Sequence, residues 1–226
     1  MDVAVVDNYT IVIPSLAAGN HILSIATLPD ANHNPVIINV TVAVNKLQTV
    51  LWRDDVIATY NVNRDLVITL KDSKGNVLSG ASVTVDLNGS KTYTTDSNGQ
   101  IKVSTKGLDP KTYAAKVTFN GDNNYEKSTK EFKITVKKAT PKLTAKKKTF
   151  KKSVKVKKYS IVLKDNLGKA IKNAKVTIKV GKKKFNAKTN SKGKATFKIK
   201  KLTKKGTYKA TLTYKGNAYY NKVTKK

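Results

Sequence analysis

Short runs in which apolar and polar residues alternate recur along the chain, and residues typical of turns separate them. The pattern is clearest in residues 46–138, with the successive runs LQTVLW, LVITL, ASVTVDL, KTYTT, QIKVS, TYAAKVTF and EFKITV. A period of two predicts strands that bury one face, and the Asn-Gly pairs at 88–89, 98–99 and 120–121 supply the positive φ angles of tight hairpin turns. Helical periodicity never lasts beyond a turn or two, so the pattern predicts an all-β protein.

The runs repeat at a nearly fixed distance along the chain. Residues 66–89 align with residues 159–182 at an offset of 93, and residues 22–46 align with the stretch ending at Lys138 at an offset of 92. Self-similarity at one period is the signature of a repeat protein. We expect three segments: residues 1–45 as the C-terminal half of a repeat, 46–138 as a complete repeat, and 139–226 as a lysine-rich repeat lacking its last strand. Two partial repeats predict a piece of a longer chain, with natural caps as the alternative.

Each repeat is about 92 residues long and contains about seven predicted strands. Short antiparallel strands at this length are typical of an immunoglobulin-like β-sandwich. Tyr113 and Tyr208 stand at the start of the penultimate strand, each just after a turn, where the hydroxyl of a tyrosine corner bonds back to the turn backbone. His21 occupies this place in the first segment. The sequence therefore predicts tandem Ig-like β-sandwich repeats.

The repeats share the motif L-K-D-x-x-G, then A-x-V-T with an apolar residue, then D/N-S-x-G and G-D/N-x-x-Y. This motif resembles the Ig-like repeats of prokaryotic cell-surface adhesin-like proteins, and it is most similar to the lysine-rich adhesin-like proteins of methanogenic archaea. The resemblance spans the whole chain. It implies an extracellular location at the cell surface, with a signal and an anchor outside this fragment. A function does not follow from a fold alone.

The net charge of +31 is unevenly distributed. Residues 138–226 contain 31 of the 45 basic residues and only one of the 14 acidic residues, Asp165. The densest stretch, KKKTFKKSVKVKK at Lys146–Lys158, is typical of a disordered basic tail when read alone. At the offset of 93, however, Phe150 aligns with Ile57 and Tyr159 with Leu66, while polar positions become lysine. We therefore predict that this stretch is the first-strand region and the lead into the second strand, with its charge facing solvent.

A basic, folded repeat suggests that the chain binds an anionic polymer. We expect a non-catalytic stalk or adhesin fragment whose basic repeat docks electrostatically on an anionic cell wall or envelope surface. The candidate contact residues are Lys146, Lys147, Lys148, Lys151, Lys152, Lys155, Lys157, Lys158, Lys182, Lys183 and Lys184.

Two alternatives to this docking role stay open. The repeats themselves could bind host or partner-cell glycans or proteins as an adhesive module, or the charge could serve solubility without a binding role. No specific nucleic-acid contact is expected, because the aromatic residues of the basic repeat align with apolar positions of the previous repeat and are interpreted as core. Lysine also lacks the fixed fork of arginine that recognises phosphates by geometry.

Other candidate chemistry is weak. Asp72 and Asp165 recur in a turn, where such a side chain accepts backbone N–H bonds, and GDNNY at 121–125 is interpreted as a turn rather than a calcium loop. There is no Cys, no cluster of metal ligands, no cofactor motif and no catalytic motif, so we expect no enzyme, no metal and no cofactor. No apolar run is long enough to cross a bilayer. The sequence also contains the glycosylation sequons of Asn8, Asn39 and Asn88.

Overall fold

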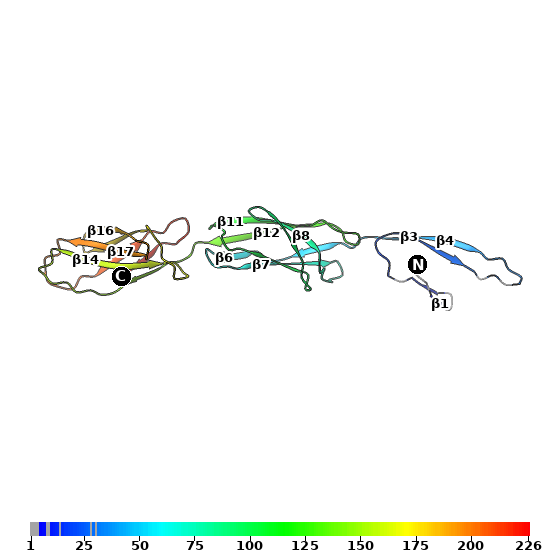
Figure 1. Cartoon of the computed structure of the whole chain (residues 1–226), viewed down its shortest axis with the longest axis horizontal. Helices are drawn as coiled ribbons and strands as arrows, with labels where there is room; N and C mark the ends of the chain where they lie inside the picture. Colours follow the sequence, from blue (N-terminus) through cyan, green and yellow to red (C-terminus); the bar gives the residue numbers. More distant parts are fainter. Residues whose placement is uncertain (1–4, 8–9, 14, 28, 30) are drawn as a thin grey trace. The chain divides into compact units, whose positions relative to one another are not determined.

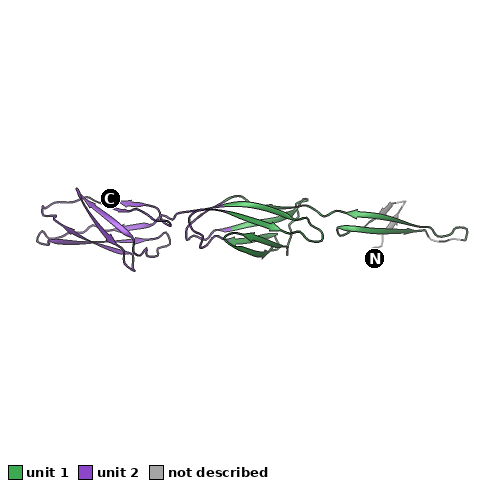
Figure 2. Cartoon of the chain, turned by 90° about the horizontal axis from the view of Figure 1, so that it is seen from above, with its two compact units in different colours: residues 1–55, 66–103, 114–133 green, residues 56–65, 104–113, 134–226 purple. Residues whose placement is uncertain are grey.

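The computed structural model describes residues 5–7, 10–13, 15–27, 29 and 31–226. All regular elements in these residues are β-strands, which confirms the all-β prediction (Figure 1). Contacts between Cα atoms group the chain into two compact units, and the division runs through the middle of the chain (Figure 2). The first unit comprises residues 1–55, 66–103 and 114–133, and the second comprises residues 56–65, 104–113 and 134–226.

The first segment consists of two antiparallel strand pairs. The short strand β1 (Val5–Asp7) pairs with β2 (Thr10–Val12), and β3 (Gly19–Ala26) pairs with β4 (Ile37–Val44). Among residues 13–46, none whose exposure is described is buried, and the side chain of Ile22 is 73% exposed. The alternating residues of β3 and β4 therefore form a hairpin in which no described side chain is buried.

Residues 46–138, which we call the middle segment, form an Ig-like sandwich of two sheets. One sheet has the order β10-β7-β5, and the other has the order β6-β12-β11-β8-β9. The strands are β5 (Thr49–Trp52), β6 (Val56–Thr59), β7 (Asp65–Asp72), β8 (Ser82–Asp86), β9 (Ser90–Thr94), β10 (Gln100–Ser104), β11 (Thr112–Phe119) and β12 (Ser128–Lys137). The pairs β5–β7, β8–β9 and β8–β11 are antiparallel, whereas β6 runs parallel to the end of β12, with Val56 opposite Ile134.

Residues 139–226, which we call the basic segment, form a second sandwich. Its sheets have the orders β13-β14-β17 and β16-β15-β18-β19. The strands are β13 (Lys142–Ala145), β14 (Val156–Lys164), β15 (Lys175–Val180), β16 (Lys183–Lys188), β17 (Lys194–Lys200), β18 (Ala210–Tyr214) and β19 (Val223–Lys225). The final strand β19 is only three residues long and pairs with the end of β18.

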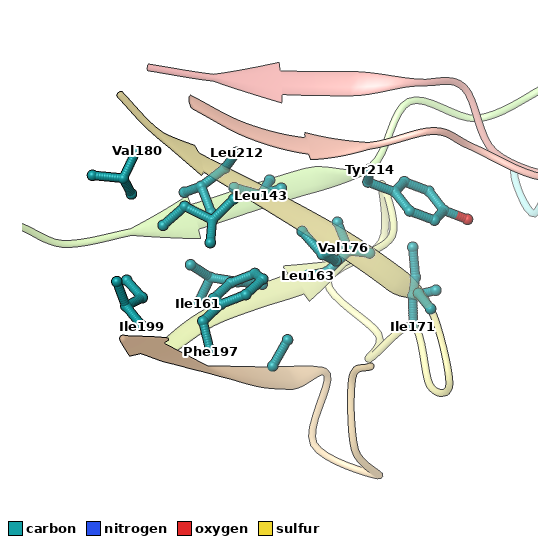
Figure 3. Packing of buried hydrophobic residues seen from close by; sticks show 13 residues of the cluster. Leu143, Ile161, Leu163, Ile171, Val176, Val180, Phe197, Ile199, Leu212 and Tyr214 are labelled. Atoms are coloured by element: carbon teal, nitrogen blue, oxygen red, sulfur yellow. The ribbon is translucent and has the colours of Figure 1, made fainter. Parts of the chain in front are cut away.

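The two sheets of the basic segment enclose a continuous apolar core (Figure 3). Ile161 and Leu163 of β14 face it from one sheet, and Ile178 of β15 faces it from the other, all at most 1% exposed. Phe197 of β17 is fully buried. Burying such a side chain contributes about 1.5–3 kcal/mol, so this core holds the segment together despite its charge.

The prediction for Lys146–Lys158 is wrong over most of its length. Residues 146–155 form a loop between β13 and β14, and only the last three residues of the run, Val156–Lys158, lie in a strand. The corresponding strand of the middle segment, β6, is held by Ile134–Lys137 at the end of β12. Residues 139–226 contain no equivalent of that half-strand, so a strand in the lysine loop has no neighbour with which to pair.

Candidate polyanion-binding surface

Strand alternation in the basic segment places apolar side chains inside and lysines outside. In β15, the sequence KVTIKV leaves Lys175 and Lys179 exposed and buries Val176, Ile178 and Val180. In β17, Lys194, Lys198 and Lys200 are exposed in the same way between buried neighbours. Because successive side chains of a strand point to opposite faces, the core and the charge occupy separate surfaces of each sheet.

The strand register places several of these lysines directly opposite one another. In the β15–β16 pair, Lys175 stands opposite Lys188 and Lys179 opposite Lys184. The other sheet repeats the arrangement with Lys158 opposite Lys198 and Lys142 opposite Lys164. Directly opposed residues have Cβ atoms about 4.5–5.5 Å apart, and like charges at this separation destabilise a sheet. Each sheet of the basic segment therefore carries a concentrated positive charge on its outer face.

The positions of β8 and β9 in the middle segment that correspond to these lysines of β15 and β16 are neutral or acidic. There Ser82 stands opposite Thr94, and Asp86 stands opposite Ser90 on one side and Lys116 on the other. The change to lysine is thus confined to outward positions of an otherwise similar sandwich. Sequence reasoning missed Lys175, Lys179 and Lys188, because several other residues separate them along β15 and β16, whereas the lysines from Lys146 onward are much denser in the sequence. The alternation in KVTIKV was the signal that could have found them.

The predicted lysines at 146–155 are exposed, and side-chain contacts tie their loop to the sandwich. The hydroxyl of Tyr159 donates to the carbonyl oxygen of Lys146 at 2.9 Å, and burial raises the pKa of this tyrosine. The Nζ of Lys148 donates to the carbonyl of Lys158 at 3.0 Å and also lies 5.1 Å from the centre of the Phe150 ring. The run is therefore a folded loop, not a basic tail.

The second predicted group, Lys182–Lys184, lies at the β15–β16 turn. Lys183 donates from Nζ to the carbonyl of Lys201, which directly follows β17, while Lys184 points outward from β16. The end of β17 in turn stands opposite Val156 at the start of β14, directly after the lysine loop. The structure thus brings the two predicted groups to the same end of the basic segment.

The aromatic residues of the basic segment follow the prediction only in part. Tyr214 is buried, which raises the pKa of its hydroxyl, and Tyr159 and Phe185 pack against the core. Tyr208 and Tyr219, also interpreted as core, are 44% and 37% exposed. Within the second compact unit, the Tyr219 ring instead stacks on Tyr60, with ring centres 4.9 Å apart.

The tyrosine-corner positions make similar hydrogen bonds. Tyr113 donates from its hydroxyl to the carbonyl of Asp109 at 3.1 Å, and Tyr208 donates to that of Lys204 at 2.9 Å, each four residues earlier. His21 contacts the carbonyl of Ala17 through Nε2 at 2.8 Å with the same spacing. Tyr113 lies in β11, whereas Tyr208 stands just before β18.

The recurring aspartates, Asp72 and Asp165, accept hydrogen bonds from the backbone of their own turns. Asp72 accepts the backbone N–H groups of Lys74 and Asn76 through Oδ1, and Asp165 accepts those of Leu167 and Lys169, all at 2.8–2.9 Å. The side-chain amide of Asn76 adds a bond to Asp72 and lowers the pKa of that carboxyl. A carboxylate occupied in this way stabilises its turn.

The loop GDNNY is also a turn. Asp122 accepts the backbone N–H groups of Asn124 and Tyr125 through Oδ1, both at 2.9 Å. Across the described part of the chain, no three His, Cys, Asp or Glu side chains come close enough to hold a metal ion.

The glycosylation sequons differ in position. Asn88 is exposed in the β8–β9 turn with φ of 55°, and Asn39 is exposed within β4, where its Oδ1 accepts a hydrogen bond from Ser24. Asn8 lies outside the described residues. No helix long and apolar enough to span a membrane occurs in the described residues.

No protein-family model and no curated protein sequence matches the chain. Among solved structures, a bacterial ice-binding adhesin of 1.5 MDa is similar at 14% identity and a TM-score of 0.38, over 86% of this chain and 68% of that one. Invasin, a bacterial integrin-binding protein, is similar at 19% identity and a TM-score of 0.43, over 79% of this chain and 38% of that one. A Parabacteroides merdae β-glucuronidase matches at 9% identity and a TM-score of 0.29, over 80% and 25%. TM-scores this low say nothing about a shared function.

Proposed function

We propose that the chain is a non-catalytic part of a cell-surface stalk or adhesin, and that its basic segment docks on an anionic cell wall or envelope polymer. One observation carries the proposal: between two similar sandwiches, the outward positions change to lysine while the inward positions stay apolar. Self-repulsion of this size opposes folding, so a role for the charge outside the core is the simplest explanation.

A salt series tests this docking. The full chain is sedimented with a purified anionic wall polymer, and uncharged dextran serves as the control. Diffuse attraction weakens as the Debye length falls from roughly 30 Å at 0.01 M to 3 Å at 1 M salt. We expect strong binding at low salt, little at 1 M, and none to dextran. Binding that persists unchanged at 1 M salt would refute an electrostatic dock.

The adhesive alternative places the binding site in the Ig-like repeats themselves, with a host or partner-cell glycan or protein as the ligand. In that case, reducing the charge of the basic segment leaves binding to the target cell intact. Measuring the attachment of beads coated with the full chain, before and after lysine-to-serine changes in the basic segment, separates the two functions.

A further inference from the structure

The outer face of β15 and β16 carries a more ordered arrangement than diffuse charge requires. Lys175 and Lys188 form one opposed pair, and Lys179 and Lys184 form a second. Four residues along a strand correspond to about 13–14 Å, so two pairs of charges stand at that spacing on one face. We call these residues the four-lysine face.

A row of uncharged polar side chains separates the two pairs. Asn186, Thr177, Thr213 and Thr224 stand opposite one another across β16, β15, β18 and β19. Thr177 donates from its hydroxyl to Oδ1 of Asn186 at 2.7 Å. The corresponding row of the middle segment is also polar, with Thr84 opposite Thr92 and Thr118. The row is thus common to both sandwiches, whereas the flanking lysines occur only in the basic one.

We propose that the four-lysine face binds a linear anionic polysaccharide, an inference that rests on the proposed electrostatic docking and names its contact surface. The lysine pairs contact acidic groups along the polymer, and the hydroxyl and amide row hydrogen-bonds to sugar hydroxyls between them. Opposed ammonium groups repel each other when the face is empty, and a carboxylate or sulfate placed between them relieves that repulsion. Binding of an acidic group between two opposed lysines is therefore favoured at both ends of the polar row.

The same face fits a nucleic acid poorly. Proteins that bind single strands stack bases on exposed aromatic rings. The strands β15 and β16 contain a single aromatic residue, Phe185, and its ring packs against the core on the opposite side of the sheet. The lysines, moreover, are point charges without the bidentate geometry of arginine.

Two charge-matched variants of the full chain test the inference. The first replaces Lys175, Lys179 and Lys184 with Ser and Lys188 with Thr. The second replaces the opposed lysines of the other sheet with Ser, at positions Lys142, Lys158, Lys164 and Lys198. Both remove four charges and two opposed pairs, so only the face differs between them. Circular dichroism confirms that each variant is folded before binding is compared.

Binding of polygalacturonate and of dextran sulfate is measured by calorimetry at low salt. Exposed ion contacts each change a binding constant by roughly 1.4-fold to fivefold, so we expect the first variant to bind about tenfold or more weakly and the second within about threefold of the original chain. Equal losses in both variants would overturn the four-lysine face while leaving diffuse docking intact. Absence of binding by the unchanged chain would overturn the proposed function itself.

The hydroxyl row has its own variant, in which Thr177 and Thr213 become Val without any change of charge. We expect binding of polygalacturonate to fall several-fold while binding of inorganic polyphosphate, which has no sugar hydroxyls, stays constant. Equal effects on both polymers would show that the row does not recognise a saccharide. Tighter binding of single-stranded DNA than of polygalacturonate would overturn the choice of ligand.

Discussion

Replacing Lys179 with Glu should stabilise the basic segment, because it converts a repulsive cross-strand pair into an attractive one. Lys179 stands opposite Lys184 in register, and the equivalent position of the middle segment is Asp86. Opposed charge pairs contribute roughly 0.2–1 kcal/mol in either direction, so reversing the sign should raise the free energy of unfolding by about 0.5–2 kcal/mol. For a sandwich of this size, that corresponds to an increase in Tm of roughly 2–16 °C.

Thermal unfolding followed by circular dichroism at about 0.01 M and 1 M salt measures the effect, since salt at 1 M screens an exposed pair almost completely. Hydrogen exchange of β15 and β16 peptides assigns the change to the basic segment. The matched control is Lys192→Glu, which changes the net charge equally but lies in the turn before β17, outside every strand pair. Equal stabilisation by both changes would refute the role of register and leave only the net charge.

Three other changes test turns and buried contacts. Thr189→Val should lower the free energy of unfolding, measured by urea denaturation, by about 2–4 kcal/mol. The buried hydroxyl of Thr189 accepts a hydrogen bond from the Ala174 N–H and donates one to the Ile171 carbonyl, and both partners lose it in the variant. A loss below about 1 kcal/mol would contradict this reasoning. Gly193→Ala should lower the Tm far more than Gly168→Ala. Both glycines have a positive φ, but a Cβ at Gly193 would clash with the Leu163 carbonyl oxygen, whereas a Cβ at Gly168 would meet no atom within 4 Å. Equal effects would contradict the clash as the cause. Asn76→Ala should raise the pKa of Asp72 in an NMR titration, and an unchanged pKa refutes the assigned cause.

The lowered pKa of Asp72 also sets the direction of a pH effect. Its carboxylate is favoured in the folded state, so its contribution to stability is fully present above the ordinary value of 3.8 and is lost as the pH falls through the lower folded value. The Asn76→Ala variant should therefore lose less stability than the original chain on acidification below that value.

The alternation of apolar and polar residues was sufficient to predict the fold and most of the core. Val83, Val85 and Ile178 are buried where the period of two placed them, and Gly99 and Gly193 stand at the predicted turns with positive φ. Local turn chemistry was equally predictable, since Asp72 and Asp165 accept the N–H bonds expected of them. These features depend on residues close in sequence, so one sequence is enough to predict them.

The register of paired strands, and which strands pair, could not be predicted in the same way. Whether Lys175 meets Lys188 depends on the alignment of two strands, which the spacing of lysines within one strand does not specify. The lysine loop was misassigned for a related reason: its counterpart β6 is a strand because the distant residues Ile134–Lys137 pair with it. A segment can keep its apolar positions and still lose its strand when the partner is missing.

The parallel pairing of β6 with the end of β12 determines how the middle segment carries mechanical load. The chain enters β6 from one end of the sandwich and leaves β12 at the other, so tension on the two ends drags these strands along each other in opposite directions. Their four residue pairs, from Val56 opposite Ile134 to Thr59 opposite Lys137, are then sheared together instead of being peeled one at a time.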